Sequence, residues 1–185
     1  MANWCSTSYV FFSKTEEPIK KLYNAVRSAT SPDRTDNRTS DFKADWLGNI
    51  LIDHGFDWKK IRCRGSVTYI REPDSNGDYY FFELSEEGAW CPQSEVFENV
   101  LTLPEYDGIQ FVYMAEESGC EVYINTDTSG LFFPEKYYCE VFTDDEDFIG
   151  SEYFEMKKDL NKYIKEMKKN YRGCDVHVHT FENHA

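Results

Sequence analysis

The chain has 185 residues, of which 17% are aromatic and 29% are charged, and its formal net charge is -14. This length allows one domain with its own hydrophobic core, and so many aromatic residues exclude a disordered chain. Nowhere do about 18 apolar residues occur together, and no basic N-terminal stretch leads into an apolar run. We therefore expect a cytoplasmic protein with no membrane span and no signal peptide.

The first third of the chain predicts a strand followed by two helices. Residues 8–14 are aromatic and β-branched, as in a strand, and apolar residues recur with helical spacing in 15–30. Residues 31–40 hold almost no apolar side chains and many turn formers, which predicts an exposed loop. Helical spacing returns in 41–55, where Gly55 is placed to end the helix.

The middle of the chain predicts two hairpins with a helix between them. Residues 65–85 hold two β-rich runs around an Asn-Gly dipeptide, which supplies the positive φ angles of a tight turn. Apolar spacing predicts a helix over 92–103, which stops before a proline. Residues 108–115 and 120–126 then predict a second pair of strands, joined by a short polar turn.

The last part predicts a strand over 135–142, an acidic loop over 143–150, the longest helix over 151–171 and a strand over 175–181. Acidic residues come early in this helix and lysines late, as the helix dipole favours. Because the hairpins need antiparallel neighbours, we expect an α+β fold with one mainly antiparallel sheet and helices packed on one face. The other face would be open to a partner.

Charge is distributed unevenly along the chain. Residues 1–71 hold 12 Lys/Arg and 8 Asp/Glu, residues 72–155 hold 1 and 22, and residues 156–185 hold 7 and 4. Lys136 is the single basic residue of the acidic middle segment. Such a segment repels nucleic-acid phosphates and attracts a basic partner, although it also serves simply to keep a surface soluble. We expect a basic host protein as partner rather than nucleic acid.

The cysteines and histidines give no pattern of a metal site. The six cysteines are scattered and none forms a C-x-x-C pair, so we expect reduced thiols and no structural zinc. His177 and His179 alternate on a predicted strand with His184 nearby, but no carboxylate has the spacing to complete a ligand set. No phosphate-binding loop or dinucleotide fingerprint occurs either. The sequence therefore predicts no metal and no cofactor.

Three short motifs resemble a known family. They are Asn3-Trp4-Cys5 at the first strand, Trp90-Cys91-Pro92 before a helix, and Glu117-x-Gly119 after a Tyr/Phe-rich strand. Together they are similar to the YubB-like ferredoxin-fold family, whose members occur mostly on bacterial plasmids, phages and conjugative elements. The chain departs from that family in having Cys91-Pro92-Gln93 where Ser-Pro-Pro is common. The resemblance implies a single ferredoxin-like domain over 1–185, with no established enzymatic activity or cofactor.

Cys91 is the candidate nucleophile of the sequence, because a helix N-terminus can lower the pKa of a thiol. A thiol enzyme also needs a base and an oxyanion site, and the spacing of the four histidines places none of them beside Cys91. We therefore predict a structural corner. In it, Trp90 anchors the end of a strand in the core, Cys91 lies near the helix cap and Pro92 occupies the first turn. No catalytic residue is predicted.

Two pairs of adjacent glutamates, Glu86 with Glu87 and Glu116 with Glu117, invite comparison with the paired acids of glycosidases. That chemistry needs carboxylates that face each other, whereas adjacent residues diverge. We expect hairpin charges that belong to an acidic surface. The predicted binding residues are Glu86, Glu87, Trp90, Cys91, Glu116 and Glu117.

These observations favour a non-enzymatic accessory protein of a bacterial mobile element, acting by protein binding through an acidic surface. One alternative is an acidic DNA mimic that inhibits a DNA-binding or restriction protein, which requires the acids to form one elongated patch. The other alternative is a thiol-dependent enzyme that uses Cys91.

Overall fold

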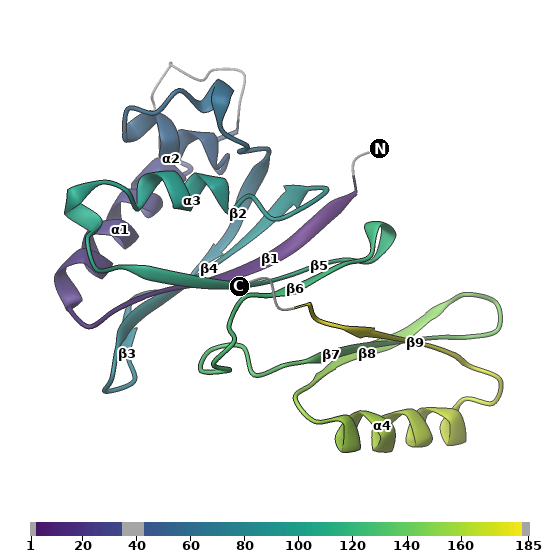
Figure 1. The fold of residues 1–185 in the computed structure, drawn as a ribbon. Coiled ribbons are helices and arrows are strands. Elements are labelled where there is room, and N and C mark those ends of the chain that lie inside the picture. The colour runs from purple at the N-terminus through teal and green to yellow at the C-terminus, as the bar shows by residue number, and fades with distance from the viewer. Residues whose placement is uncertain (1–2, 35–42, 183–185) are drawn as a thin grey trace. The chain divides into compact units, whose positions relative to one another are not determined.

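The computed structural model describes residues 3–34 and 43–182. The predicted exposed loop near 31–40 falls mostly outside these residues. The chain divides into two compact units, which we call unit 1 (Met1–Val122) and unit 2 (Tyr123–Ala185) and describe separately (Figure 1). The expectation of a single domain over 1–185 stays a prediction.

Unit 1 is built on an antiparallel sheet whose strands follow the order β2-β4-β1-β5. The central strand β1 pairs along its length with β4 on one side and with β5 on the other. A two-residue strand, β3, pairs with β4 across the predicted Asn-Gly turn, where Gly77 has a φ of 91°. The strands are β1 (Trp4–Ser13), β2 (Gly65–Ile70), β3 (Asp74–Ser75), β4 (Tyr80–Ala89) and β5 (Gln110–Glu117).

Three helices cover one face of this sheet: α1 (Glu16–Ala29), α2 (Gly48–Asp53) and α3 (Glu95–Val100) (Figure 1). Alternate residues of β1 point into this layer, and Phe11 packs against Phe82 and Phe97 at ring distances of 4.9 and 4.7 Å. The apolar stripe of α1 is buried in the same core, as its spacing predicts. Short 3-10 turns complete the unit: η2 (Trp58–Lys60), η3 (Pro104–Tyr106) and η4 (Ser118–Cys120).

The second helix is much shorter than the predicted span of 41–55. Before Gly48, the Trp46 ring nitrogen donates to the carbonyl of Cys63 at 2.8 Å, and the Asn49 amide donates to the carbonyl of Ala44 at 2.9 Å. Trp46 also forms a β-bridge with Ser66. These tertiary bonds hold the segment as a turn, so helical spacing alone gave the wrong start.

Unit 2 contains a three-stranded antiparallel sheet in the order β8-β7-β9, with one helix against it. Cys139 and Val141 of β7 pack with Leu160 of the helix to form its core. The strand β6 (Val122–Asn125) lies at the boundary of the two units. The other elements are β7 (Tyr137–Phe142), β8 (Phe148–Phe154), α4 (Lys157–Asn170) and β9 (Asp175–Thr180).

The long C-terminal helix begins at Lys157, not at 151 as the sequence predicted. Residues 151–154 belong to β8 and pair with β7, with Tyr153 opposite Tyr138. The acidic loop is correspondingly shorter, closed by a bond from the Thr143 amide to the carbonyl of Asp147 at 2.8 Å. Aromatic residues of 148–154 suit a strand as well as a helix, and cross-strand pairing decides between them.

The α+β class with mainly antiparallel pairing is confirmed, since residues 3–34 and 43–182 combine antiparallel sheets with four helices. The expected single sheet is wrong, because β7, β8 and β9 form a sheet of their own. In the described part of the chain, no helix is both long and apolar enough to cross a membrane.

Candidate functional site

The Trp90 corner joins β4 to α3 at one end of the unit 1 sheet. Ala89 is paired with Trp4, and the chain then turns at Trp90 through the left-handed region, with a φ of 74°. The Trp90 amide donates to the carbonyl of Asn3 at 2.9 Å. Its ring is 47% exposed, so the prediction that it anchors the strand in the core is wrong. The left-handed turn takes Trp90 out of β4, so its side chain does not continue the inward and outward alternation of that strand.

Glu86 holds the inner side of this corner. It is 1% exposed, and its Oε1 accepts hydrogen bonds from the Tyr9 hydroxyl at 2.9 Å and from the Gln93 amide at 2.8 Å. Burial raises the pKa of Glu86 to about 7, against the opposing effect of hydrogen bonds from Gln93, Tyr9 and Thr7. No local pattern predicts this role, because the bond to Tyr9 joins residues 77 positions apart.

The buried Gln93 side chain completes the support of the corner. Its Oε1 accepts from the Arg64 amide at 2.9 Å, and its Nε2 donates to the carbonyl of Cys91 at 2.7 Å. A side chain at Gly88 would meet this carbonyl at 2.7 Å, so the corner also needs a glycine in β4. The corner is therefore a hydrogen-bonded unit that fixes the direction of Trp90.

Cys91 is half-buried and its Sγ accepts a hydrogen bond from the Arg62 guanidinium at 3.2 Å. Helix α3 begins at Glu95 with Ser94 as its N-cap, so Cys91 lies before the helix cap rather than at it. The only histidine of unit 1, His54, instead contacts the Tyr106 hydroxyl at 2.6 Å and the carbonyl of Ile50 at 2.7 Å. Unit 1 thus gives Cys91 a cation but no histidine base.

The four predicted glutamates separate onto two faces of the sheet. Glu86 and Glu117 are buried on the helix-covered face, 1% and 8% exposed. Glu87 and Glu116 point to the opposite face, where both lie across from Ser6, one on β4 and one on β5. Adjacent glutamates therefore diverge, while two glutamates from different strands come together around β1.

Trp4 lies on this same face, two residues before Ser6, and is 58% exposed. Trp4 is directly opposite Ala89, which places Glu87 at the diagonal position within reach of a large ring. We call Trp4, Glu87, Trp90 and Glu116 the acid–aromatic end of unit 1. Three of these residues are among the binding residues predicted from the sequence, and Trp4 is not, because its exposure depends on the pairing of β1.

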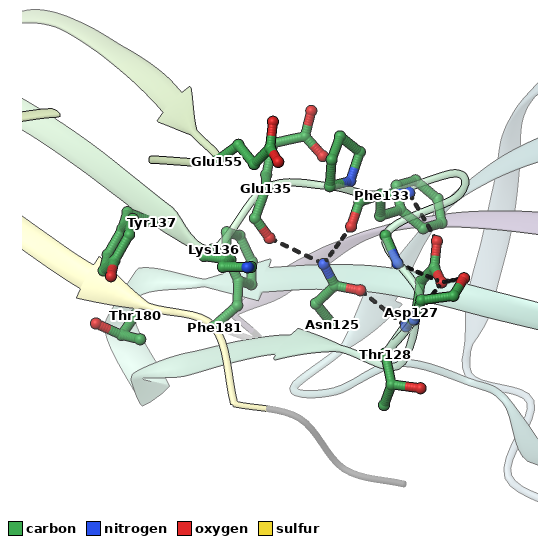
Figure 2. Close-up of a pocket in the computed structure, with 13 residues that line it drawn as sticks. Asn125, Asp127, Thr128, Phe133, Glu135, Lys136, Tyr137, Glu155, Thr180 and Phe181 are labelled. Atoms are coloured by element: carbon green, nitrogen blue, oxygen red, sulfur yellow. Dashed lines mark hydrogen bonds between the residues drawn. The ribbon is translucent and has the colours of Figure 1, made fainter. Parts of the chain in front are cut away.

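A pocket of about 270 Å³ lies in unit 2, and none of the six predicted binding residues lines it (Figure 2). Its wall includes the segment between β6 and β7 and the ends of β8 and β9. Elsewhere in this unit His177 contacts Asp175 at 3.0 Å, and the His179 ring stacks on Tyr123 at 4.0 Å. Within residues 3–34 and 43–182, no group of three or more His, Cys, Asp or Glu side chains is arranged to hold a metal ion.

No family model matches the chain, and no curated protein or solved structure is significantly similar to it.

Proposed function

We propose that unit 1 binds a basic segment of a partner protein through its acid–aromatic end. The observation that carries the proposal is Trp90, a large exposed aromatic held in the left-handed backbone region. For a bulky residue this conformation is an outlier that costs about 1–3 kcal/mol, and glycine would adopt it without strain. A strained aromatic residue with about half of its surface exposed is characteristic of a binding surface.

The tryptophans of unit 1 differ in how far they are buried. Trp46 is 7% exposed, packs edge-on against Trp58 at 5.1 Å and satisfies its ring nitrogen with the carbonyl of Cys63. Trp4 and Trp90 present their rings to solvent at one end of the sheet. Tryptophan is enriched among the residues that dominate protein interfaces, because it buries a large area at little entropic cost.

The chemistry of the partner follows from the acids near Trp4. Glu87 and Glu116 place two carboxylates around Ser6 on the face that carries Trp4. An arginine or lysine side chain gains both an ion pair with a carboxylate and a cation–π contact with an indole ring. This combination supports the sequence-based expectation of a basic host protein as partner, and it requires no catalysis.

Other features support placing this function in a YubB-like accessory protein of a mobile element. Apart from the inserted α2 and the two-residue β3, the helices and strands of unit 1 follow the order β1-α1-β2-β4-α3-β5, and the strand order is β2-β4-β1-β5. Both orders agree with a ferredoxin-like split βαβ arrangement. Two of the family-like motifs, at Trp4 and Trp90, meet at the acid–aromatic end. All six cysteines are free thiols, which supports a reducing compartment such as the cytoplasm.

The proposal is tested by affinity capture from lysate of the native host with matched variants. The double variant E87Q/E116Q and the single variant W90A should each lose a basic protein that the unchanged chain retains at low salt and releases at high salt. The control E72Q/E105Q removes the same charge from two exposed positions outside the acid–aromatic end and should retain the partner. Equal capture by all four proteins contradicts the proposal.

The same experiment separates the DNA-mimic alternative. Mimicry needs surface acids, and Glu86 and Glu117 contribute none because both are buried. A mimic's partner would be a DNA-binding protein that duplex DNA displaces, and its capture would not depend on the Trp90 ring. Capture that is sensitive to W90A and unaffected by duplex DNA favours the acid–aromatic end.

A further inference from the structure

The segment between β6 and β7 in unit 2 is built around two buried polar side chains. Asp127 is 6% exposed, and its Oδ1 accepts from the amides of Ser129 and Gly130 at 3.1 and 3.0 Å and from the Ser129 hydroxyl at 2.6 Å. Its Oδ2 accepts from the amides of Phe132 and Phe133 at 2.7 and 3.0 Å. One carboxylate thus fixes the backbone of a whole turn.

Asn125 ties the two ends of this segment together. Its Oδ1 accepts from the Asp127 amide at 2.9 Å, and its Nδ2 donates to the carbonyls of Phe133 and Glu135, both at 2.9 Å (Figure 2). Asn125 is 4% exposed. Because every polar atom of the two buried side chains has a partner within the segment, the wall that they form is preorganised rather than adaptable.

This preorganised segment forms one side of the pocket of about 270 Å³. The volume lies just below the range of roughly 300–1,000 Å³ that is usual for ligand sites, so it suits a ligand smaller than a drug molecule. Its lining combines aromatic rings with the hydroxyl of Thr180 and with the charged side chains of Glu135, Lys136 and Glu155 (Figure 2). It also includes Asp127, whose carboxylate is already bound by the amides of the turn. Preformed pockets with a few convergent polar groups are the usual form of small-molecule sites.

Glu135, Lys136 and Glu155 have no ion-pair partner among the described residues. The other lysines of unit 2 lie on α4. Lys136 is also the single basic residue of the acidic segment 72–155. Its backbone is fixed on both sides, because its amide donates to the carbonyl of Phe154 at 2.9 Å and its carbonyl accepts from the Phe181 amide at 3.0 Å. The only cation of that segment therefore stands at the pocket, beside two acids.

We propose that this pocket binds a small zwitterion, a molecule with one ammonium group and one carboxylate or phosphate group. Glu135 and Glu155 receive the ammonium, Lys136 receives the anion, and Phe133 and Phe181 contact the carbon skeleton. A simple anion would be repelled by the two carboxylates, and a simple cation would leave Lys136 unmatched. This site is independent of the acid–aromatic end and goes beyond protein binding by unit 1.

The test uses the full chain and ligand-observed saturation-transfer NMR, with calorimetry for any probe that binds. The probes are the free proteinogenic L-amino acids and phosphoethanolamine, which between them supply both kinds of anion. For the tightest binder, the matching amine without the anion and the matching acid without the amine are measured as well. We expect the zwitterion to bind and both halves to bind at least roughly tenfold more weakly, as loss of a charge-assisted hydrogen bond implies.

Variants locate the binding in the pocket. E155Q and K136M should each weaken it by roughly tenfold, whereas E152Q and K158M, which change exposed residues of the same unit outside the pocket, should leave it unchanged. Circular dichroism of each variant reports whether the fold is retained. Absence of binding by every probe, equal binding to all four variants, or equally tight binding of the amine alone each overturns the proposal.

Discussion

Two buried carboxylates organise the two candidate sites of this protein, and their pKa values are shifted in opposite directions. Glu86 holds the Trp90 corner of unit 1, and Asp127 holds the pocket wall of unit 2. Burial raises the pKa of Glu86 to about 7. For Asp127, burial acts in the same direction, but hydrogen bonds from Ser129 and from the amides of Phe133, Phe132 and Gly130 outweigh it and lower the pKa.

The pKa shifts of Glu86 and Asp127 differ because the two carboxyl groups differ in how deeply they are buried and in how many hydrogen-bond donors surround them. Glu86 lies on the helix-covered face among aromatic rings, where Tyr9, Gln93 and Thr7 cannot offset the loss of water around its charge. Asp127 lies in a turn whose successive amides converge on it, so its charged form is solvated by the backbone. Burial alone therefore does not determine whether a carboxylate stays ionised.

The largest expected effect is on the stability of unit 2, through substitution of Asp127. D127N should lower the free energy of unfolding by about 4 kcal/mol, because an amide group cannot accept at its nitrogen and leaves backbone donors unsatisfied. Since the pKa of Asp127 is lowered, its contribution is present above the ordinary pKa of 3.8 and is lost as the pH falls through the folded value. Urea unfolding of unit 2 at neutral and acid pH measures both effects.

The control for this prediction is S129A, which removes the hydroxyl bond at 2.6 Å and leaves the amide bonds in place. It should cost about 1 kcal/mol. If D127N proves no more destabilising than S129A, Asp127 does not hold the pocket wall through its charge.

The second prediction concerns the pH dependence of unit 1. Because the folded pKa of Glu86 is raised from 4.5 to about 7, its contribution to stability is fully present below the lower value and is lost as the pH rises through the higher one. The stability of unit 1 should fall by about 3 kcal/mol over this interval from Glu86 alone. E86Q should remove that slope in urea unfolding measured at a series of pH values.

The matched control is E83Q, which changes a partly exposed glutamate of the same strand that pairs with Arg71 at 2.9 Å. The slope should survive this change. A slope that persists in E86Q and disappears in E83Q would assign the pH dependence to the surface instead of the corner.

The smallest predicted effect compares the left-handed residues of the two regions. The corner uses Trp90 with a φ of 74°, and the pocket wall uses Gly130 with a φ of 68°. W90G should stabilise unit 1 by about 1 kcal/mol, because strain is relieved, and abolish capture of the partner. G130A should destabilise unit 2 by about 1 kcal/mol, since the added methyl group meets only ordinary contacts at 3.6 Å from Pro134 and the cost is backbone strain.

Thermal unfolding of both variants measures this pair, and W90A supplies the control that removes the ring while keeping a side chain at positive φ. W90A should lose capture without the gain in stability. Stabilisation by W90A as large as that by W90G would show that the ring, not the backbone, is the source of strain.

Local patterns in the sequence determined several elements, because their causes lie within a few residues. The apolar spacing of α1, the Asn-Gly turn before β4 and the alternation of β9 each gave the correct element. The charge layout likewise singled out Lys136, although nothing in the sequence tied it to a pocket. The expectation that adjacent glutamates diverge agrees with the structure, although Glu86 and Glu117 are buried strand residues and not hairpin charges of a surface.

Tertiary structure alone decided the functional geometry, because it depends on strand register and burial between residues far apart in the chain. Ser6 brings Glu87 and Glu116 together only through the pairing of β1 with both β4 and β5. Glu86 is buried and supports the corner, Trp90 is exposed, and residues 151–154 form a strand. Each of these outcomes depends on a neighbour in space that no local sequence pattern specifies. The sequence determined which residue types were present, and the tertiary contacts decided which of them face solvent, which face a cavity and which carry charge.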